Sequence, residues 1–504
     1  MIEIMDTTLR DGEQTSGVSF SSTEKLSIAH LLLVDLGVNR IEVASARVSE
    51  GEFATVKRIA KWADSIGKLD QVEVLGFVDN GASLQWAKDA GLKNLNLLTK
   101  GSYKHVTEQL RKTPEEHLAD ILRELEIAKE LGINVNVYLE DWSNGIMHSE
   151  DYVYFIMDGL KNTSIIKRFM LPDTLGILNP HSTWRCCRRM ISRYPELHFD
   201  FHAHNDYDLG VANTMVAVEV GVKGVHLTIN GLGERAGNAS LASAIAVFHD
   251  HLKLKTSINE EKINTVSRVV ETYSGLSIAA NQPIVGSNVF TQTAGIHADG
   301  DSKNNLYFNE LFPERFDRVR EYALGKLSGK SNILKNIEAL GIDLSHDEMM
   351  QVTNKVIELG DKKEIITQVD LPFIIMDVLK DRHKEQAIKI ISYAFTLSKG
   401  LRPACTIGID INGEYHESTA PGDGQYHAFS KALWKIYHIL GKSIPELTNY
   451  MVYIPPGGRT DALVQTTISW KFKNKDFKTR GLDPDQMAAA MIATERMLNI
   501  IEDM

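Results

Sequence analysis

Eight short β-rich runs, each separated from the next by an amphipathic helical stretch, fill the first half of the sequence. Several are almost continuously apolar, which is typical of parallel strands covered on both faces. The runs lie at residues 2–8, 40–45, 72–78, 95–99, 134–140, 166–173, 198–204 and 225–231. Eight βα units within about 260 residues have the number and size of a (β/α)8 barrel. A doubly wound open sheet is the alternative, but the glycine-rich dinucleotide fingerprint expected after its first strand is missing. We therefore predict a TIM barrel.

The first connecting helix shows how local signals support this order. Ser21 and Glu24 have the spacing of a capping box. Leucine and isoleucine side chains then follow at helical spacing, and Gly37 stands where a left-handed residue would end the helix. The next β-rich run begins soon afterwards, so the sequence predicts a complete strand–helix–strand unit.

The rest of the chain divides into two further regions. Residues 263–386 look mostly helical, and their last, highly charged part at 380–386 is typical of a hinge or linker. Residues 387–504 combine β-rich runs with two helices, in a weak repeat of two strands and a helix. We predict an α/β protein with three parts: an N-terminal TIM barrel (1–262), helical linker subdomains (263–386) and a C-terminal α+β domain (387–504).

Composition excludes several classes of protein. Lys and Arg number 55 against 66 Asp and Glu, a formal net charge of −11, and no long basic run offers a surface for nucleic acid. Three cysteines, two of them adjacent, are too few for a disulfide framework and indicate a reducing compartment. No apolar run approaches the length of a membrane span, and the N-terminus lacks a signal-peptide pattern. We expect a cytoplasmic protein that binds neither nucleic acid nor membrane.

Two histidines at the end of the seventh run are the strongest site signal. His202 and His204 are two residues apart, so on a strand both imidazoles point to the same face. Barrel sites form at the C-terminal ends of the strands, which makes Asp11 the natural third metal ligand and Asn238 a candidate fourth. A purely structural role is the alternative, but the pairing favours a metal site. Mn²⁺, Mg²⁺ and Zn²⁺ all suit these ligands.

Other groups at the strand ends allow two interpretations each. Arg10 either orients Asp11 through a salt bridge or faces a developing oxyanion, and both are compatible. Glu140 is either the structural partner of a cation or a proton-transfer group. Leu75, Leu98 and Tyr138 either fill a barrel layer or narrow a pocket for a small substrate.

Four motifs of the barrel region are similar to those of the metal-dependent Claisen condensation enzymes, the family of 2-isopropylmalate, homocitrate and citramalate synthases. They are D-T-T-L-R-D-G-E-Q (6–14), L-P-D-T-L-G (171–176), H-A-H-N-D (202–206) and N-G-L-G-E-R-A-G-N (230–238). The resemblance continues through G-I-H-A-D-G (295–300) and P-P-G-G-R-T-D-A-L (455–463) and covers essentially the whole chain. Segments such as 41–49, 75–79 and 137–145 look like the pyruvate-using, citramalate-forming branch.

This resemblance implies an acyltransferase that condenses pyruvate with acetyl-CoA and water, giving (R)-citramalate and CoA in isoleucine biosynthesis. It implies that Arg10 holds an oxygen of the reactants and Thr174 the pyruvate carboxylate, while Glu140 and His297 are the candidate bases. It further implies that residues after the barrel line the acetyl-CoA side, and that this region covers the barrel mouth of a neighbouring subunit. These residues are Asp299, Asn305, Leu306 and Tyr307.

The resemblance also implies a homodimer whose tail is a leucine-type regulatory domain. Its expected effector-binding residues are Tyr426, Ile454, Thr460, Val464, Pro484 and Gln486. Because citramalate leads toward isoleucine, isoleucine is the first choice of feedback inhibitor; leucine is kept as the second, since His427 stands where relatives often carry an acidic residue. Two alternatives stay open: a 2-isopropylmalate synthase, which uses 2-oxoisovalerate, and a non-catalytic amino-acid sensor.

Overall fold

The structure, a computed structural model, falls into two compact units that we describe separately. One comprises Met1–Phe290 with Phe308–Arg320, and the other comprises Thr291–Tyr307 with Glu321–Met504. The residues described are 2–303, 305–325, 328–340, 344–361, 366, 371, 374–375, 378, 387–453, 464–473 and 475–502. The predicted hinge at 380–386 lies outside them, and the division of the chain at residues 262 and 386 stays a prediction.

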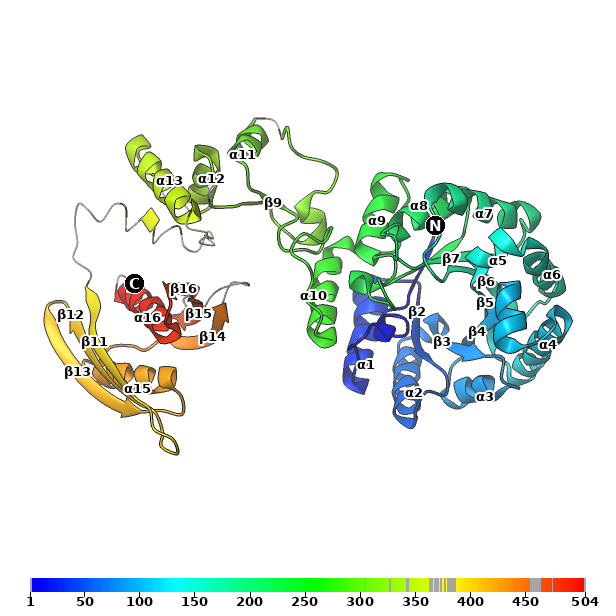
Figure 1. Ribbon diagram of the computed structural model, residues 1–504, viewed down its shortest axis with the longest axis horizontal. Helices are drawn as coiled ribbons and strands as arrows, with labels where there is room; N and C mark the ends of the chain where they lie inside the picture. The colour runs from blue at the N-terminus through cyan, green and yellow to red at the C-terminus, as the bar shows by residue number, and fades with distance from the viewer. Residues whose placement is uncertain are drawn as a thin grey trace. The chain divides into compact units, whose positions relative to one another are not determined.

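The first unit is a closed barrel of eight parallel strands in sequential order, so the predicted TIM barrel is confirmed (Figure 1). The strands are β1 (Glu3–Asp6), β2 (Arg40–Ser45), β3 (Val72–Phe77), β4 (Asn94–Lys100), β5 (Asn134–Glu140), β6 (Ile166–Asp173), β7 (Phe199–Ala203) and β8 (Gly224–Leu227). β1 pairs with β2 on one side and with β8 on the other, which closes the barrel. All eight overlap the predicted runs.

Helices surround the barrel and bury its outer, apolar face in one continuous core. They are α1 (Ser22–His30), α2 (Glu50–Ser65), α3 (Ala82–Asp89), α4 (Pro114–Leu131), α5 (Trp142–His148), α6 (Glu150–Leu160), α7 (Pro180–Arg193), α8 (Gly210–Val220), α9 (Leu241–Asp250) and α10 (Ile263–Ser274). The capping box at α1 is present, since the Ser21 hydroxyl accepts from the Glu24 amide and the Glu24 carboxylate accepts from the Ser21 amide. α1 continues as the π-helical turn Leu31–Leu36, and Gly37 ends it at φ 82°. A Cβ at Gly37 would lie 2.7 Å from the Ser257 carbonyl oxygen, so a larger residue would clash as well as be strained.

Inside the barrel, an apolar layer and a polar layer support the mouth. Met5, Leu75, Tyr138 and Met170 form a small buried cluster, against which Leu98 packs. The polar layer is a chain of side-chain hydrogen bonds across the barrel interior that joins Glu42 on β2, Asn96 on β4 and Asn136 on β5. For example, the Asn96 amide donates to Glu42 Oε1 at 2.7 Å. Both layers are almost fully buried. The side chains at the mouth of the barrel therefore pack on a rigid interior.

The second unit contains helices, two short strands and a pair of three-stranded antiparallel sheets. Its elements are β9 (Thr291–Gln292), α11 (Gly295–Ser302), β10 (Glu321–Tyr322), α12 (Lys330–Leu340), α13 (His346–Asp361), β11 (Ile388–Thr396), β12 (Ala404–Ile411), β13 (Glu414–Pro421), α15 (Gln425–Ile439), β14 (Glu446–Tyr453), β15 (Val464–Phe472), β16 (Lys475–Asp483) and α16 (Gln486–Glu502). The predicted C-terminal α+β architecture is confirmed.

The repeat in the tail differs from the prediction, because each copy has three strands and a helix rather than two strands and a helix. The additional strands are β13 and β16, and each lies at the edge of its sheet. Most side chains of β13 are exposed or half-buried, so this strand carries little of the apolar alternation by which strands are found in a sequence.

Cys186, Cys187 and Cys405 are buried free thiols, as expected for a protein without a disulfide framework. No helix among the described residues is long and apolar enough to cross a membrane.

Candidate active site

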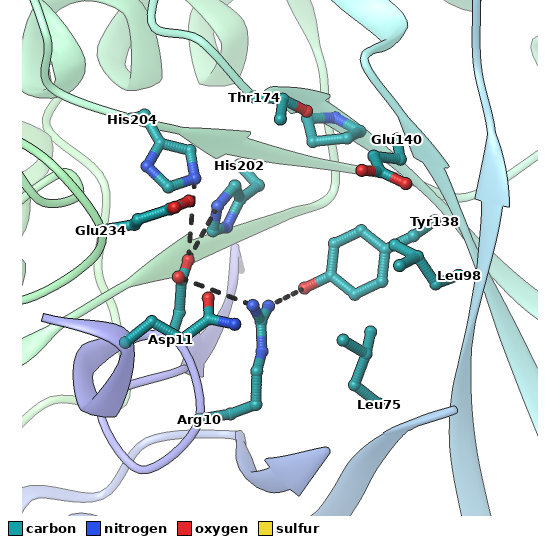
Figure 2. A pocket seen from close by; sticks show the side chains of 12 residues that line it. Arg10, Asp11, Leu75, Leu98, Tyr138, Glu140, Thr174, His202, His204 and Glu234 are labelled. Atoms are coloured by element: carbon teal, nitrogen blue, oxygen red, sulfur yellow. Dashed lines mark hydrogen bonds and ion pairs between the residues drawn. The ribbon is translucent and has the colours of Figure 1, made fainter. Parts of the chain in front are cut away.

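A pocket opens at the C-terminal ends of the barrel strands, where the sequence analysis placed the site (Figure 2). It combines charged and imidazole groups with a wall of larger side chains. The lining residues are Arg10, Asp11, Gln14, Leu75, Leu98, Tyr138, Glu140, Pro172, Thr174, His202, His204 and Glu234. All predicted site residues of the barrel except Asn238 line this pocket, whereas Gln14 and Pro172 were not anticipated.

Asp11, His202 and His204 form a candidate metal site at one side of the pocket. Their ligand atoms all lie within 4.8 Å of one another, and all three side chains are buried. Nε2 of His202 lies 3.2 Å from Asp11 Oδ2, and Nε2 of His204 lies 3.8 Å from the same oxygen (Figure 2). Two imidazole nitrogens and a carboxylate oxygen converging in this way are a ligand set for a divalent cation.

Asn238 stands beside this group, but its amide is turned away from the ligand position. Its Nδ2 donates to Asp11 Oδ2 at 2.9 Å, while its buried Oδ1 has no hydrogen-bond partner. A half-turn of the amide would exchange the two atoms and direct the oxygen at the same point. The unpartnered oxygen fits a site completed by a cation, because a buried acceptor without a partner is costly.

The protonation states suit metal ligands. Burial by itself would raise the pKa of Asp11, but Arg10 and both histidines favour the carboxylate and hold this pKa well below its usual range. Burial, followed by the effect of His202, lowers the pKa of His204 to about 4. At neutral pH an ionised carboxylate therefore faces a neutral imidazole, as metal binding requires.

Arg10 is held by contacts on three sides. Its Nε donates to Glu42 Oε2 at 2.5 Å, its Nη2 donates to the Tyr138 hydroxyl at 3.4 Å, and its Nη1 lies 3.6 Å from Asp11 Oδ1. Both interpretations of Arg10 are compatible with this geometry. The guanidinium neutralises Asp11, and it has five N–H groups, so some remain to bind a ligand oxygen in the pocket.

Glu140 forms an ion pair with a cation, which was one of its two interpretations, but the sequence analysis did not identify the partner. Lys100, the last residue of β4, lies directly opposite Glu140 in the parallel β4–β5 pairing, and its ammonium donates to Glu140 Oε2. Glu140 ends one predicted strand and Lys100 directly follows the neighbouring predicted run at 95–99, but only the strand register brings the two together. The pair places a cation next to the carboxylate while leaving Glu140 in the pocket lining.

Thr174 connects the loop after β6 to the loop after β8. Its hydroxyl accepts from the Asp141 amide at 2.9 Å, so its own proton is available to another acceptor. Its carbonyl accepts from Arg235 Nη2 at 2.7 Å, and Arg235 also forms a bidentate pair with Asp206. These contacts fasten the glycine-rich loop that carries Glu234 to the neighbouring strand ends.

The remaining predicted catalytic residues belong to the second unit. The His297 and Tyr307 rings lie 4.3 Å apart between centroids, and the Asp299 carboxylate accepts from Lys303 at 2.7 Å. Leu306 is 69% exposed, and Asn305 has a left-handed backbone at φ 56°. These residues therefore cluster on and just after α11.

The predicted effector residues are described only in part. Ile454 and Thr460 lie outside the described residues. The Tyr426 hydroxyl forms a 2.8 Å hydrogen bond with the Thr494 hydroxyl. The centroid of its ring lies 4.9 Å from that of Tyr450, a residue that the sequence analysis did not single out. The Tyr450 hydroxyl also interacts with the side chain of Gln486. Val464 is buried, whereas Pro484 is exposed.

Comparisons with protein families cover most of the chain in three consecutive segments. Residues 1–270 match the HMGL-like family, residues 284–364 match the homocitrate synthase post-HMGL domain-like family, and residues 365–502 match the LeuA allosteric (dimerisation) domain.

Curated relatives of similar length carry two different names. The chain is 33% identical over 503 residues to the (R)-citramalate synthase CimA of Methanocaldococcus jannaschii, with 99% of each chain covered. It is 31% identical over 508 residues to the 2-isopropylmalate synthase of the same organism, covering 99% of this chain and 94% of the relative. Both relatives therefore extend over barrel, linker region and tail.

Proposed function

Since the chain belongs to the HMGL-like family, and its full-length relatives are named citramalate and 2-isopropylmalate synthases, we propose that it is a citramalate synthase. In this reaction pyruvate and acetyl-CoA condense with water to give (R)-citramalate and CoA. One observation carries the choice of acceptor: the side of the pocket away from the metal ligands is a closed wall of large side chains.

That wall is formed by Leu75, Leu98 and Tyr138. Leu75 and Tyr138 are only 5% and 3% exposed, because Met5 and Met170 pack behind them. Because other side chains pack behind the wall, its residues cannot move back to enlarge the pocket without disturbing the packing of the barrel interior. The wall therefore suits the methyl group of pyruvate better than the isopropyl group of 2-oxoisovalerate.

The metal site supplies the electrophilic side of the proposed reaction. Asp11, His202 and His204, with Asn238 after a half-turn of its amide, would hold Mn²⁺, Mg²⁺ or Zn²⁺. Bound there, the cation would act as a Lewis acid on the keto group of the acceptor. Thr174 donates its free hydroxyl proton to the acceptor carboxylate, and the remaining N–H groups of Arg10 hold an oxygen of the reactants.

Proton transfer from the acetyl methyl group is assigned to Glu140 and His297. Glu140 lines the pocket, and its pairing with Lys100 keeps the carboxylate in one place. His297, with Tyr307, Asp299, Asn305 and Leu306, would form the acetyl-CoA side, contributed by the second unit of a partner subunit. The enolate then attacks the keto carbon, and hydrolysis of the thioester releases CoA.

The tail is assigned to assembly and feedback control. It matches the LeuA allosteric (dimerisation) domain, which supports a homodimer. Tyr426 and Gln486 offer a hydroxyl and an amide to an amino acid, and the domain would bind isoleucine or, as second choice, leucine. Titrating both amino acids against the full-length enzyme and a Tyr426→Ala variant tests this assignment. Inhibition equally strong in the variant would place the effector site elsewhere.

A thiol-release assay with a panel of keto acids tests the proposed function. Pyruvate should give the highest kcat/KM, and chelation of divalent cations should abolish turnover. Preference for 2-oxoisovalerate would instead identify a 2-isopropylmalate synthase. Release of no CoA with any keto acid, in the presence of Mn²⁺, Mg²⁺ or Zn²⁺, would identify a non-catalytic sensor.

A further inference from the structure

A chain of buried polar side chains leads from the pocket wall into the barrel interior. The Tyr138 hydroxyl lies 2.9 Å from Nδ1 of His226 on β8, and Nε2 of His226 lies 3.1 Å from Asp200 Oδ2 on β7. Asp200 pairs in turn with Arg40 and with His198. Tyr138, His226 and Asp200 are each 3% exposed or less, so water does not compete for these contacts.

The charge at the inner end determines the direction of every hydrogen bond in this chain. Asp200 faces donors on every side, because Arg40 Nη2 and His226 Nε2 both lie at its Oδ2 and His198 Nε2 lies 2.9 Å from its Oδ1, so the side chain acts as a carboxylate paired with Arg40. A carboxylate only accepts, so His226 must donate from Nε2. The His226 ring is 1% exposed and its carboxylate partner is already paired with Arg40, so burial favours the neutral ring, and its Nδ1 accepts. The Tyr138 hydroxyl therefore donates to His226.

The outer end of the chain is Arg10. Once the Tyr138 proton is committed to His226, the phenolic oxygen presents only lone pairs to its other neighbour, Arg10 Nη2 at 3.4 Å. The Arg10 guanidinium thus meets an acceptor at Tyr138, a carboxylate at Glu42 and another at Asp11. With the opposite His226 tautomer, Tyr138 would accept from the ring, and its proton would be free to point at the guanidinium.

We propose that His226 and Asp200 are positioning residues, which fix the donor direction of the Tyr138 hydroxyl and thereby orient Arg10 toward the keto acid. The role deepens the proposed condensation activity and rests on it. Barrel interiors are normally filled by branched apolar side chains, and buried ionic groups add little net stability. A residue at position 226 that only filled space in the barrel would not need two nitrogen atoms, each with a hydrogen-bond partner.

Two substitutions at His226 separate the two contacts. His226→Asn retains a polar atom near the position of Nδ1, facing Tyr138, and removes the contact with Asp200. His226→Gln retains a polar atom near Nε2, facing Asp200, and removes the acceptor of Tyr138. We expect His226→Gln to lower kcat/KM for pyruvate by roughly tenfold and His226→Asn by less than about threefold. The KM for acetyl-CoA should not change in either variant.

A double-mutant cycle with Tyr138→Phe identifies the route of the effect. If His226 acts through the Tyr138 hydroxyl, His226→Gln should have no further effect on kcat/KM once that hydroxyl is absent. A loss that persists in the Tyr138→Phe background, or equal losses in the Asn and Gln variants, would overturn the proposal. Thermal unfolding of each variant separates these results from simple destabilisation.

If the His226→Gln variant does not fold, the isosteric substitution Asp200→Asn tests the same proposal. An amide can donate to Nε2 and so permit the other tautomer; as in His226→Asn, Tyr138 keeps an acceptor whose direction is no longer fixed, and a loss of about threefold in kcat/KM for pyruvate is expected. An unchanged kcat/KM in a folded Asp200→Asn enzyme would refute the proposal. The unsubstituted enzyme in the same assay tests the proposed function independently, because its failure to use pyruvate would be seen before any variant is compared.

Discussion

Truncating Leu98 should widen the acceptor pocket with little loss of stability. Leu98 is only partly buried and packs at the edge of the cluster formed by Leu75, Tyr138 and two methionines. One additional methylene in a closed pocket costs about 1–3 kcal/mol, or roughly 10- to 200-fold in kcat/KM. Because Leu98 is not fully enclosed, we use the lower end of this range. Leu98→Ala should raise the ratio of kcat/KM for 2-oxobutanoate to that for pyruvate by about tenfold.

Leu97 provides a matched control on the same strand. It is 1% exposed and belongs to the core between barrel and helices, on the face opposite to the pocket. Leu97→Ala should destabilise the protein by roughly 2–5 kcal/mol and leave the substrate ratio unchanged. Thiol release with both keto acids and thermal unfolding measure the two effects. An unchanged ratio in a folded Leu98→Ala enzyme, or an equal rise in Leu97→Ala, would refute the assignment of the wall.

Three further predictions concern the metal, the ion pair and pH. His202→Ala should lose Mn²⁺ binding, measured by calorimetry, together with turnover; a variant active after chelation would contradict the metal site. Lys100→Met should lower kcat by about tenfold, because the Glu140 carboxylate loses the cation that holds it in place, whereas Lys100→Arg should retain most activity. Burial lowers the pKa of His117 to about 4, so the unfolded chain binds the additional proton below its ordinary pKa of 6.5 and stability falls with pH in that window. Urea unfolding should show a loss of about 2 kcal/mol from this group between pH 7 and pH 5, absent in His117→Gln.

The barrel could be predicted in detail because its strands are buried on both faces. Such strands leave nearly continuous apolar runs, and each run ends where a polar residue enters the mouth, so Asp11, Glu140 and His204 could be placed together before their distances were known. The third strand of each tail sheet, β13 and β16, was missed for the opposite reason. A strand such as β13 is stabilised by backbone pairing with its neighbour, which leaves little trace in side-chain hydrophobicity.

Pairings between strands were the other part that could not be predicted. Lys100 and Glu140 are 40 residues apart in the chain and meet only because β4 and β5 are in register. The contact between Tyr138 and His226 depends in the same way on barrel closure, which lets side chains of β5 and β8 meet inside the barrel although β6 and β7 lie between the two strands. A single sequence specifies which residues end its strands, but the register that joins them is a property of the closed sheet.

The two sides of the pocket wall are not equivalent as targets for engineering. Leu98 contacts its neighbours only through apolar surface, so a library at this position samples the shape of the pocket alone. Tyr138 belongs to the same wall, but its hydroxyl joins Arg10 to His226. Randomising Tyr138 would therefore change acceptor size and guanidinium orientation at once. Broader keto-acid scope should be easiest to evolve from the leucine side, and gains at Tyr138 should require compensating changes at His226.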